Sequence, residues 1–536
     1  MVLVCGSDKS DFAWKEVPLL QAKYQLNVIL QNLGYLNSQF VIQNEKLYVR
    51  KGPLTETEKL VLTGTNGIVD VEKKRKIIGY PIIPAKLDEV KKWAELAARR
   101  QGHACPEVTM KAEVWNKTIF ADIEPGQSQT INEIVRSGYG DLDPESIHRF
   151  EAFRKGQRYN VIETQITADR MMAQGLFQNA YITPICNGDK VDLNFVTEVG
   201  KPKLLRFSVG GSTEEFPFTD VWYKDARLDN RASNYNARLH VSPVKQKIEV
   251  NSEFYIIPHS YTTFLGPRFL AEHLKERVYE MNRSEVGADL GRGWDISGVR
   301  LDGRIGPTVH YSKTLAGQGP PETTYLAWEG KLDFLSHALE AFSRNQYEGW
   351  DARLEYSGQR EYLGSGKNID RYDFNFKYLY NVNGYSPPLF VIASRFEGIM
   401  LDPHTRDQDQ DILEIPLDLR IYYGGNENLR GFQRHALNNS SQGYLSAALA
   451  GFELRLIEVL PYHVEPFLLY DVAKLGKRQN VFMEPTFYSY GAGLRWVSPF
   501  GTLRGSAARG QIFNNNEDSN FYPTDWVFFI SFGQEF

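Results

Sequence analysis

Three short segments hold residue types that could bind a ligand or do chemistry. The run 364–368, GSGKN, resembles a phosphate-binding loop, but it lacks the earlier glycine and has Asn368 where Ser or Thr would hold Mg²⁺. The acidic run 407–411 lacks the central glycine and distal glutamate of a calcium loop. His103 and Cys105 supply two metal ligands, fewer than a zinc site needs. We therefore expect a hairpin turn, a solvated loop and no metal site.

The sequence also lacks the residue sets that common catalytic mechanisms need. There is no G-x-S-x-G element and no convincing His/Asp partner set for a nucleophile. We expect a protein that is not an enzyme and uses no cofactor. Lys and Arg number 61 against 66 Asp and Glu, a net charge of −5, so a protein that neutralises nucleic-acid phosphates is disfavoured.

The composition leaves one kind of membrane protein open. No apolar run approaches the ~18 residues of a membrane-spanning helix, and the mean hydropathy is −0.40. Alternating strands average to a polar composition, so a β-barrel is compatible with these values. The three cysteines, Cys5, Cys105 and Cys186, do not form a disulfide framework, and nothing in the sequence pairs them.

The first 200 residues contain a weak internal repeat. Helix-like runs close on Gly34, Gly102 and Gly175, which lie 68 and 73 residues apart and suit left-handed C-caps. A pair of short strands follows each glycine, and a strand and a short helix precede the second and third runs. The pattern predicts a β-α-α-β-β unit three times, at 1–54, 55–125 and 126–200, the first copy being incomplete. One larger α+β domain is the alternative.

From residue 203 onward the helical periodicity nearly vanishes and strand signals take over. We count sixteen candidate strands: 204–210, 232–241, 246–257, 268–279, 285–290, 295–311, 325–334, 350–356, 371–380, 389–399, 413–423, 444–459, 462–472, 487–497, 502–511 and 526–536.

Several of these strands alternate in the way that a lipid-facing barrel requires. In 444–459, Phe452 and Leu454 face one side while Glu453 and Arg455 face the other. Every backbone group of a membrane strand must pair around a closed ring, because hydrocarbon offers no partner. Sixteen strands without a blade repeat, ending on an aromatic residue, favour a membrane barrel at 201–536 over a water-soluble sandwich or propeller.

Four motifs follow one another near the end of the chain. They are GGNENLRGF at 424–432, EPFLLYDV at 465–472, GAGLRWVSPFGTLR at 491–504 and the terminal FGQEF at 532–536. Together with the architecture, they resemble the superfamily of BamA, TamA and the two-partner secretion transporters, in which periplasmic POTRA repeats of β-α-α-β-β form precede a sixteen-stranded antiparallel transmembrane β-barrel. Ala473 stands where that family usually has glycine.

The resemblance implies roles for particular residues. The loop before the twelfth strand would be held in the barrel by Arg430 and Asp471, with Gly431 close to the wall and Phe432 packed beside it. Such a charge-assisted pair contributes about 1.5–3 kcal/mol when partly buried. Glu453, Arg455 and Arg495 would be lumen-facing charges of the same network. A lateral seam would join the first and sixteenth strands, and its expected residues are Leu204, Gly210, Gly211, Phe532, Gly533 and Phe536.

The function implied is insertion or assembly of outer-membrane proteins, most like TamA. The expected partners are unfolded barrel or autotransporter clients, a TamB-like periplasm-spanning protein and the lipid bilayer, with no nucleic acid. The expected location is the bacterial outer membrane, with the POTRA domains in the periplasm. The alternative is a two-partner secretion transporter that exports one partner protein, although such proteins usually carry two POTRA modules. A plain porin or adhesin is a third possibility, which the 424–432 motif disfavours.

Overall fold

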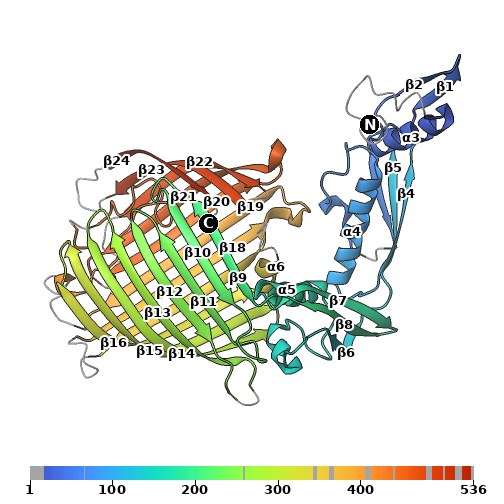
Figure 1. Ribbon diagram of the computed structural model, residues 1–536. Coiled ribbons are helices and arrows are strands. Elements are labelled where there is room, and N and C mark those ends of the chain that lie inside the picture. Colours follow the sequence, from blue (N-terminus) through green and yellow to red (C-terminus); the bar gives the residue numbers. More distant parts are fainter. Residues whose placement is uncertain are drawn as a thin grey trace.

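The protein consists of an arm of small helix–sheet units followed by a large, nearly closed barrel (Figure 1). The computed structural model describes residues 17–64, 67–257, 260–341, 347–360, 367–404, 412–438, 441–478, 486–498, 501–513 and 522–532. The acidic run 407–411 and residues 364–366 of the glycine-rich turn lie outside the described residues, as do Gly533 and Phe536.

The arm, residues 17–200, contains three sheets in series. The first unit has α3 (Leu19–Asn32), β1 (Gln39–Gln43) and β2 (Lys46–Arg50). The second has β3 (Lys59–Thr63), η1 (Val71–Lys73), α4 (Pro84–Arg100), β4 (Glu107–Glu113) and β5 (Thr118–Glu124). The third has β6 (Thr130–Ser137), η2 (Pro144–Phe150), α5 (Val161–Ala173), β7 (Phe177–Asn187) and β8 (Lys190–Val199).

The second and third units share one topology. Their sheet orders are β3-β5-β4 and β6-β8-β7, with the first strand parallel to the last and the other pair antiparallel. Each is the predicted β-α-α-β-β fold, with a 3-10 turn as the first helix. α4 turns Val90, Ala94 and Ala98 onto its sheet, since these residues recur on one helical face. The division of the chain at residues 54, 125 and 200 stays a prediction.

The barrel is one antiparallel sheet of sixteen strands in sequence order. The strands are β9 (Lys203–Gly210), β10 (Phe218–Asp225), β11 (Asn234–Val241), β12 (Lys245–Glu253), β13 (Thr263–Lys275), β14 (Glu280–Ile296), β15 (Val299–Ala316), β16 (Glu322–Ser336), β17 (Gly349–Gln359), β18 (Ile369–Asn381), β19 (Phe390–Asp402), β20 (Ser446–Leu456), β21 (Val464–Gly476), β22 (Thr486–Ser498), β23 (Gly501–Phe513) and β24 (Tyr522–Phe532). Short helical turns connect some of them: α6 (His337–Ala341), η4 (Val382–Gly384), η5 (Ile412–Glu414) and η6 (Pro461–His463).

The strand number is as predicted, but two assignments are wrong. The segment 413–423 is not a wall strand; Ile415, Leu417 and Tyr423 are buried inside the barrel, and only isolated bridges pair this segment. β10 was not predicted, because Trp222 on its lumen-facing side blurs the alternation of apolar and polar residues. One strand was missed and one was wrongly assigned, so the predicted total of sixteen is still correct. The long loop at 403–445 therefore does follow the eleventh strand, β19.

The alternation predicted for the wall is present. On β20, Phe452 and Leu454 are exposed, whereas Glu453 and Arg455 are buried inside. On β24, Phe528 and Ile530 are exposed and Phe529 is buried. None of the helices in the described part of the chain is long and apolar enough to span a membrane.

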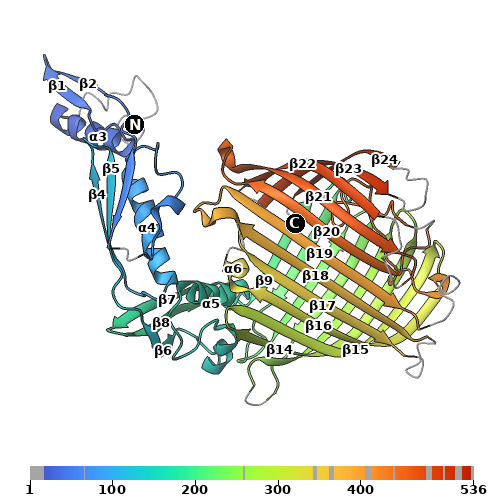
Figure 2. The ribbon, with the colours of Figure 1, turned by 180° about the vertical axis from the view of Figure 1, so that it is seen from behind.

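The third unit of the arm is fixed to one end of the barrel (Figure 2). Arg170 of α5 donates to both Asp295 oxygens (3.0 and 2.9 Å) and to Glu340 of α6 (2.7 Å). Arg149 of η2 donates to the carbonyl of Arg231, in the β10–β11 turn, at 2.8 Å. Because both guanidinium groups donate hydrogen bonds to acceptors of the barrel, the unit has a defined orientation on the barrel.

The second unit also reaches the barrel, at two turns on the same end. Ser386, in the β18–β19 turn, exchanges backbone hydrogen bonds with the carbonyl of Lys73 (2.8 Å) and the N–H of Arg75 (3.0 Å). Lys76 forms an ion pair with Glu458 in the β20–β21 turn. The arm therefore crosses the mouth of the barrel from the β10–β17 side to the β18–β21 side.

A disulfide joins the second and third units. Cys105, after α4, is bonded to Cys186 at the end of β7, with 6.4 Å between the Cα atoms. The sequence separates these residues by 81 positions, so only the folded arrangement brings them together. A structural disulfide is typical of an oxidising compartment.

Candidate functional site: the anchored loop and the barrel seam

We call the segment between β19 and β20, residues 403–445, the anchor loop. Its described part at 412–438 folds into the barrel. Its apolar residues form a cluster with the inner wall that includes Ile421, Leu429 and Phe432 from the loop and Leu449 and Phe487 from the wall. Backbone bridges Ile421–Tyr444 and Tyr423–Leu437 fold the loop on itself. The loop thus has its own core and presents the segment 424–432 to the strands β19–β23.

Arg430 and Asp471 form a bidentate pair in the interior. The Arg430 Nε and Nη2 donate to the two Asp471 oxygens at 2.7 and 2.6 Å, and the Arg430 backbone N–H donates to one of them at 3.3 Å. The arginine is 1% exposed and the aspartate 0%. With water excluded, this parallel pair fixes both the position and the orientation of the loop tip.

Glu453 of β20 extends the network. It accepts from the Arg430 Nη1, from the Arg455 Nε at 2.9 Å and from the Arg504 Nη2. Arg395 of β19 adds a fourth cation, with its Nη2 3.5 Å from Asp471. Four guanidinium groups therefore surround two carboxylates. Backbone carbonyl oxygens help to stabilise the excess positive charge, since Arg395 donates to the carbonyl of Glu427 at 2.7 Å.

Arg495 lies beside this cluster. Its Nη1 donates to Glu465 of β21 at 2.7 Å, and it stands opposite Arg504 in the β22–β23 register. Both members of the Arg495–Glu465 pair are buried. The three lumen charges expected from the sequence, Glu453, Arg455 and Arg495, thus all point inward, and Glu453 is the one in contact with Arg430.

The two residues after Arg430 explain how the loop tip meets the wall. Gly431 has φ +92°, and a Cβ there would lie 2.7 Å from backbone atoms of Arg509 and Gly510 on β23. Only glycine tolerates both the conformation and the close approach. Phe432 is 4% exposed and packs edge-on against Phe487, with ring centroids 6.2 Å apart.

The barrel closes at the junction of β9 and β24, which we call the seam. Among the described residues, the seam is joined by an isolated bridge between Ser212 and Ser531 and a hydrogen bond from the Thr213 N–H to the Ile530 carbonyl (3.1 Å). These contacts lie after the end of β9, so β9 and β24 do not form a ladder. By comparison, β10 pairs with β9 along eight residues.

The predicted seam residues lie on both sides of this junction. Leu204 and Gly210 are on β9, and Gly211 begins the turn that follows it. The space beside each glycine is filled by an aromatic ring, that of Phe218 for Gly210 and of Phe216 for Gly211. Phe532 is the last residue of β24, whereas Gly533 and Phe536 lie outside the described residues.

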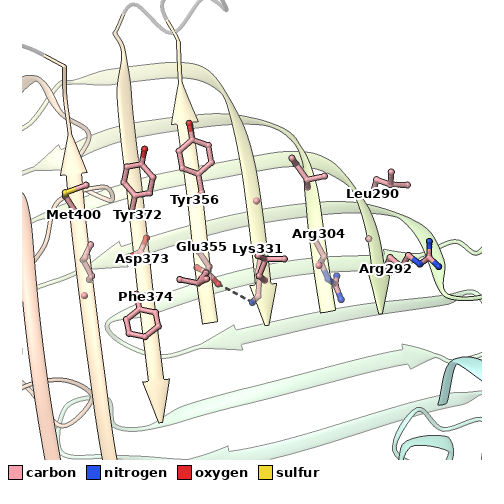
Figure 3. A pocket seen from close by; sticks show the side chains of 18 of the residues that line it. Leu290, Arg292, Arg304, Lys331, Glu355, Tyr356, Tyr372, Asp373, Phe374 and Met400 are labelled. Atoms are coloured by element: carbon pink, nitrogen blue, oxygen red, sulfur yellow. Dashed lines mark ion pairs between the residues drawn. The ribbon is translucent and has the colours of Figure 1, made fainter. Parts of the chain in front are cut away.

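Three cavities accompany these features. A polar cavity of about 850 Å³ lies in the lumen against residues 418 and 419 of the anchor loop. A groove of about 1040 Å³ follows β14–β19, and its exposed apolar side chains, such as Leu290, belong to the outer face; Tyr356, Tyr372 and Phe374 lie on neighbouring strands along it (Figure 3). A cavity of about 560 Å³ at the seam lies between 526–529 of β24 and the turns after β9, β11 and β13.

The comparisons with known proteins bear on the barrel most directly. Residues 218–536 match the model of the Omp85 superfamily domain. The chain belongs to the Omp85 superfamily. No curated protein sequence matches it.

Solved structures of similar shape are distant in sequence. The chain resembles BamA from Haemophilus ducreyi lacking POTRA domains 1–3, with 13% identity, a TM-score of 0.52, and 89% of this chain and 99% of that chain covered. CdiB from Acinetobacter baumannii matches with 14% identity and a TM-score of 0.47 over 96% and 97% of the two chains. CdiB from Escherichia coli matches with 12% identity and a TM-score of 0.48 over 96% of each chain.

Membership of the Omp85 superfamily indicates where this protein lies in the cell and what kind of client it handles. The barrel lies in the bacterial outer membrane, and the POTRA domains are in the periplasm. Omp85 proteins handle protein clients and the lipid bilayer in membrane insertion or secretion. The end of the barrel that carries the arm is therefore the periplasmic end, and the Cys105–Cys186 disulfide lies in a compartment that permits it.

Some residues of the Omp85 site are not assigned by the sequence analysis. Arg504 ends the 491–504 motif, but its place on Glu453 depends on register between strands that are not adjacent. Arg395 alternates with apolar residues of β19, so its inward direction could have been inferred, although its partner could not. The Cys105–Cys186 pairing carries no local signal at all.

Proposed function

We propose that this Omp85 protein inserts unfolded outer-membrane proteins into the bilayer by opening the seam between β9 and β24 to an incoming strand. The observation that carries the proposal is the seam itself: among the described residues, neighbouring strands pair in ladders, whereas β24 is joined to the turn after β9 by an isolated bridge and one further backbone hydrogen bond. Breaking that junction costs few hydrogen bonds, whereas every other neighbouring pair is laddered over seven residues or more.

The first strand is suited to accept a partner. β9 is exposed on both faces, and its outward residues Leu205, Phe207 and Val209 are 56–73% exposed. An edge with unpaired N–H and C=O groups is a template for β-augmentation, in which a client strand adds to the sheet through main-chain hydrogen bonds. Apolar residues on that edge would keep the growing client sheet in contact with lipid.

The aromatic edge of β24 provides the other side of the opening. The seam cavity of about 560 Å³ is lined by 526–529, which include Trp526, Phe528 and Phe529. A hairpin that enters between β9 and β24 would occupy this space before it leaves laterally into the bilayer. The process needs no nucleotide and no catalytic group, because folding of the client releases the free energy.

The arm would deliver clients to the seam. Its strands β1 and β2 form a two-stranded sheet whose edges can pair with an extended segment, and the arm spans the mouth of the barrel. We propose unfolded barrel or autotransporter proteins as clients, and a TamB-like periplasm-spanning protein as a partner. Three POTRA modules at 1–54, 55–125 and 126–200 would make the chain most similar to TamA.

Export through the lumen, as in a two-partner secretion transporter, is the second candidate. The polar cavity of about 850 Å³ in the lumen favours it, since a water-filled route is what an exported chain needs. Export would require the anchor loop to leave the lumen, and this step would break the Arg430–Asp471 pair. Lateral insertion does not require the loop to leave the lumen.

A disulfide across the seam tests the proposal. Thr213 and Ile530 are exposed and joined by a hydrogen bond, so Thr213→Cys with Ile530→Cys in a Cys5→Ser background should crosslink the seam under mild oxidation. We expect the locked protein to lose client insertion in proteoliposomes. The matched control, Val209→Cys with Thr219→Cys, crosslinks β9 to β10 and should retain insertion. Full insertion activity in the locked protein would contradict lateral opening.

A further inference from the structure

The turn after β9 contacts both the last strand and the anchor loop. We call residues 211–217 the seam turn. Within it, Ser212 and Thr213 make the two seam contacts with Ser531 and Ile530. The next residue, Glu214, accepts the backbone N–H of Asn426 through both carboxylate oxygens, at 3.2 and 3.1 Å. Three consecutive residues therefore connect β24 to the loop.

On the loop side, the contact falls where the backbone allows a close approach. Gly425 has φ +115°, and a Cβ there would lie 2.6 Å from the Glu214 Oε1. The Gly425 N–H donates to the carbonyl of Phe432 at 3.0 Å, and the Gly424 N–H donates to the Asn428 side chain at 2.8 Å. Glu214 thus holds a segment that is folded onto itself and is rigidly joined to Arg430.

On the other side, the seam turn is itself braced. The Ser212 N–H donates to the carbonyl of Glu215 at 2.9 Å, and the Glu215 N–H donates to the Ser212 Oγ at 3.0 Å. The Glu215 carboxylate hydrogen-bonds His240 of β11 at 2.9 Å. A displacement of Glu214 is therefore transmitted to Ser212 and Thr213 and is not absorbed within the turn.

We infer that Glu214 is a positioning residue that couples the seat of the anchor loop in the lumen to closure of the seam. While the loop is anchored, Asn426 holds Glu214, and Glu214 holds Ser212 and Thr213 against β24. When the loop tip shifts, Glu214 loses its donor and the seam loses its support. The role of this coupling in insertion rests on the proposed function. The contacts that form the coupling do not depend on any client.

Disulfide trapping at the seam measures this coupling in the full chain. The reporter is the Thr213→Cys, Ile530→Cys pair, oxidised briefly so that the crosslinked fraction reports the closed state. Glu214→Gln keeps the side-chain size but replaces a charge-assisted acceptor, so we expect the crosslinking rate to fall roughly three- to tenfold. Glu427→Gln is the matched control, because that carboxylate is exposed and, where the structure describes its surroundings, forms no hydrogen bond or ion pair.

Two further variants separate coupling from misfolding. Gly425→Ala disturbs the same contact from the loop side and should lower the crosslinking rate as Glu214→Gln does, in protein that still shows the folded-barrel shift on unheated gels. Arg430→Ala should also slow crosslinking, yet it should add little in the Glu214→Gln background, because both changes break one chain of contacts. Additive effects of the two changes would overturn the coupling.

Client insertion is measured in parallel to keep the two proposals distinct. An unchanged crosslinking rate in Glu214→Gln overturns the coupling, whatever the insertion activity is. A slower rate with normal insertion upholds the coupling and counts against seam opening as the controlled step in insertion.

Discussion

Replacing Arg430 by alanine tests how strongly the anchor loop is held. Arg430 makes two short hydrogen bonds to Asp471 and one to Glu453, and all three side chains are nearly inaccessible to water. The substitution leaves both carboxylates buried with fewer cations. Removing one member of a buried pair typically costs about 3–5 kcal/mol.

The neighbouring arginines reduce that cost. Arg395 lies 3.5 Å from Asp471, and Arg455 and Arg504 contact Glu453, so neither carboxylate would be left without a cation. We therefore expect Arg430→Ala to lower the free energy of unfolding by about 3 kcal/mol, at the bottom of the range for buried pairs. Asp471→Ala should cost a similar amount, because it removes the bidentate partner of Arg430.

Urea unfolding of the full chain in lipid vesicles, followed by tryptophan fluorescence, measures these changes. The double variant should cost less than the sum of the two single variants, with a coupling of about 1.5–3 kcal/mol. Arg353→Gln is the control, since its ion pair with Asp333 has side chains 51% and 32% exposed and should contribute less than about 1 kcal/mol. Losses below 1 kcal/mol with no coupling would refute the anchoring role of the pair.

Two further predictions concern the arm. Cys105→Ser with Cys186→Ser removes the covalent link between the second and third units, so in a Cys5→Ser background the distances between spin labels at 91 in α4 and 462 in the β20–β21 turn should broaden. An unchanged distribution would show that other contacts hold the arm. Burial raises the pKa of the Glu163 carboxyl in α5 to about 7 from 4.5. Stability that depends on its protonated form is present below pH 4.5 and lost as the pH rises through 7. Glu163→Gln should therefore increase amide protection in α5 relative to wild type at pH 8 and not at pH 4.5, and equal effects at both pH values would contradict this.

The sequence was most informative where one local rule decides the structure. Period-two alternation identified the faces of β20 and β24, because one side contacts lipid and the other the lumen. Glycine C-caps placed the helix ends in the arm, with Gly102 at φ +95°. The strand prediction at 413–423 is wrong because a buried loop with apolar side chains produces a strand-like pattern.

The parts that sequence could not predict depend on distant segments meeting. Glu214 and Asn426 are separated by 212 positions. Glu214 belongs to no recognisable motif, and nothing in the 424–432 motif indicates that the Asn426 backbone has a partner after β9. The pairing of Cys105 with Cys186 depends on the angle between two units. Arg504 reaches Glu453 across intervening strands, and only the tilt and curvature of the barrel set that distance.

Site-specific photo-crosslinking to a client during insertion tests the central claim most directly. A photoreactive residue is placed at Phe207 or Val209 on the exposed edge of β9, at Phe528 on β24, or at Lys331 in the polar cavity of the lumen. Lateral insertion predicts client adducts at the β9 and β24 positions and none at Lys331. Adducts confined to Lys331 would contradict the account and show that the client passes through the lumen.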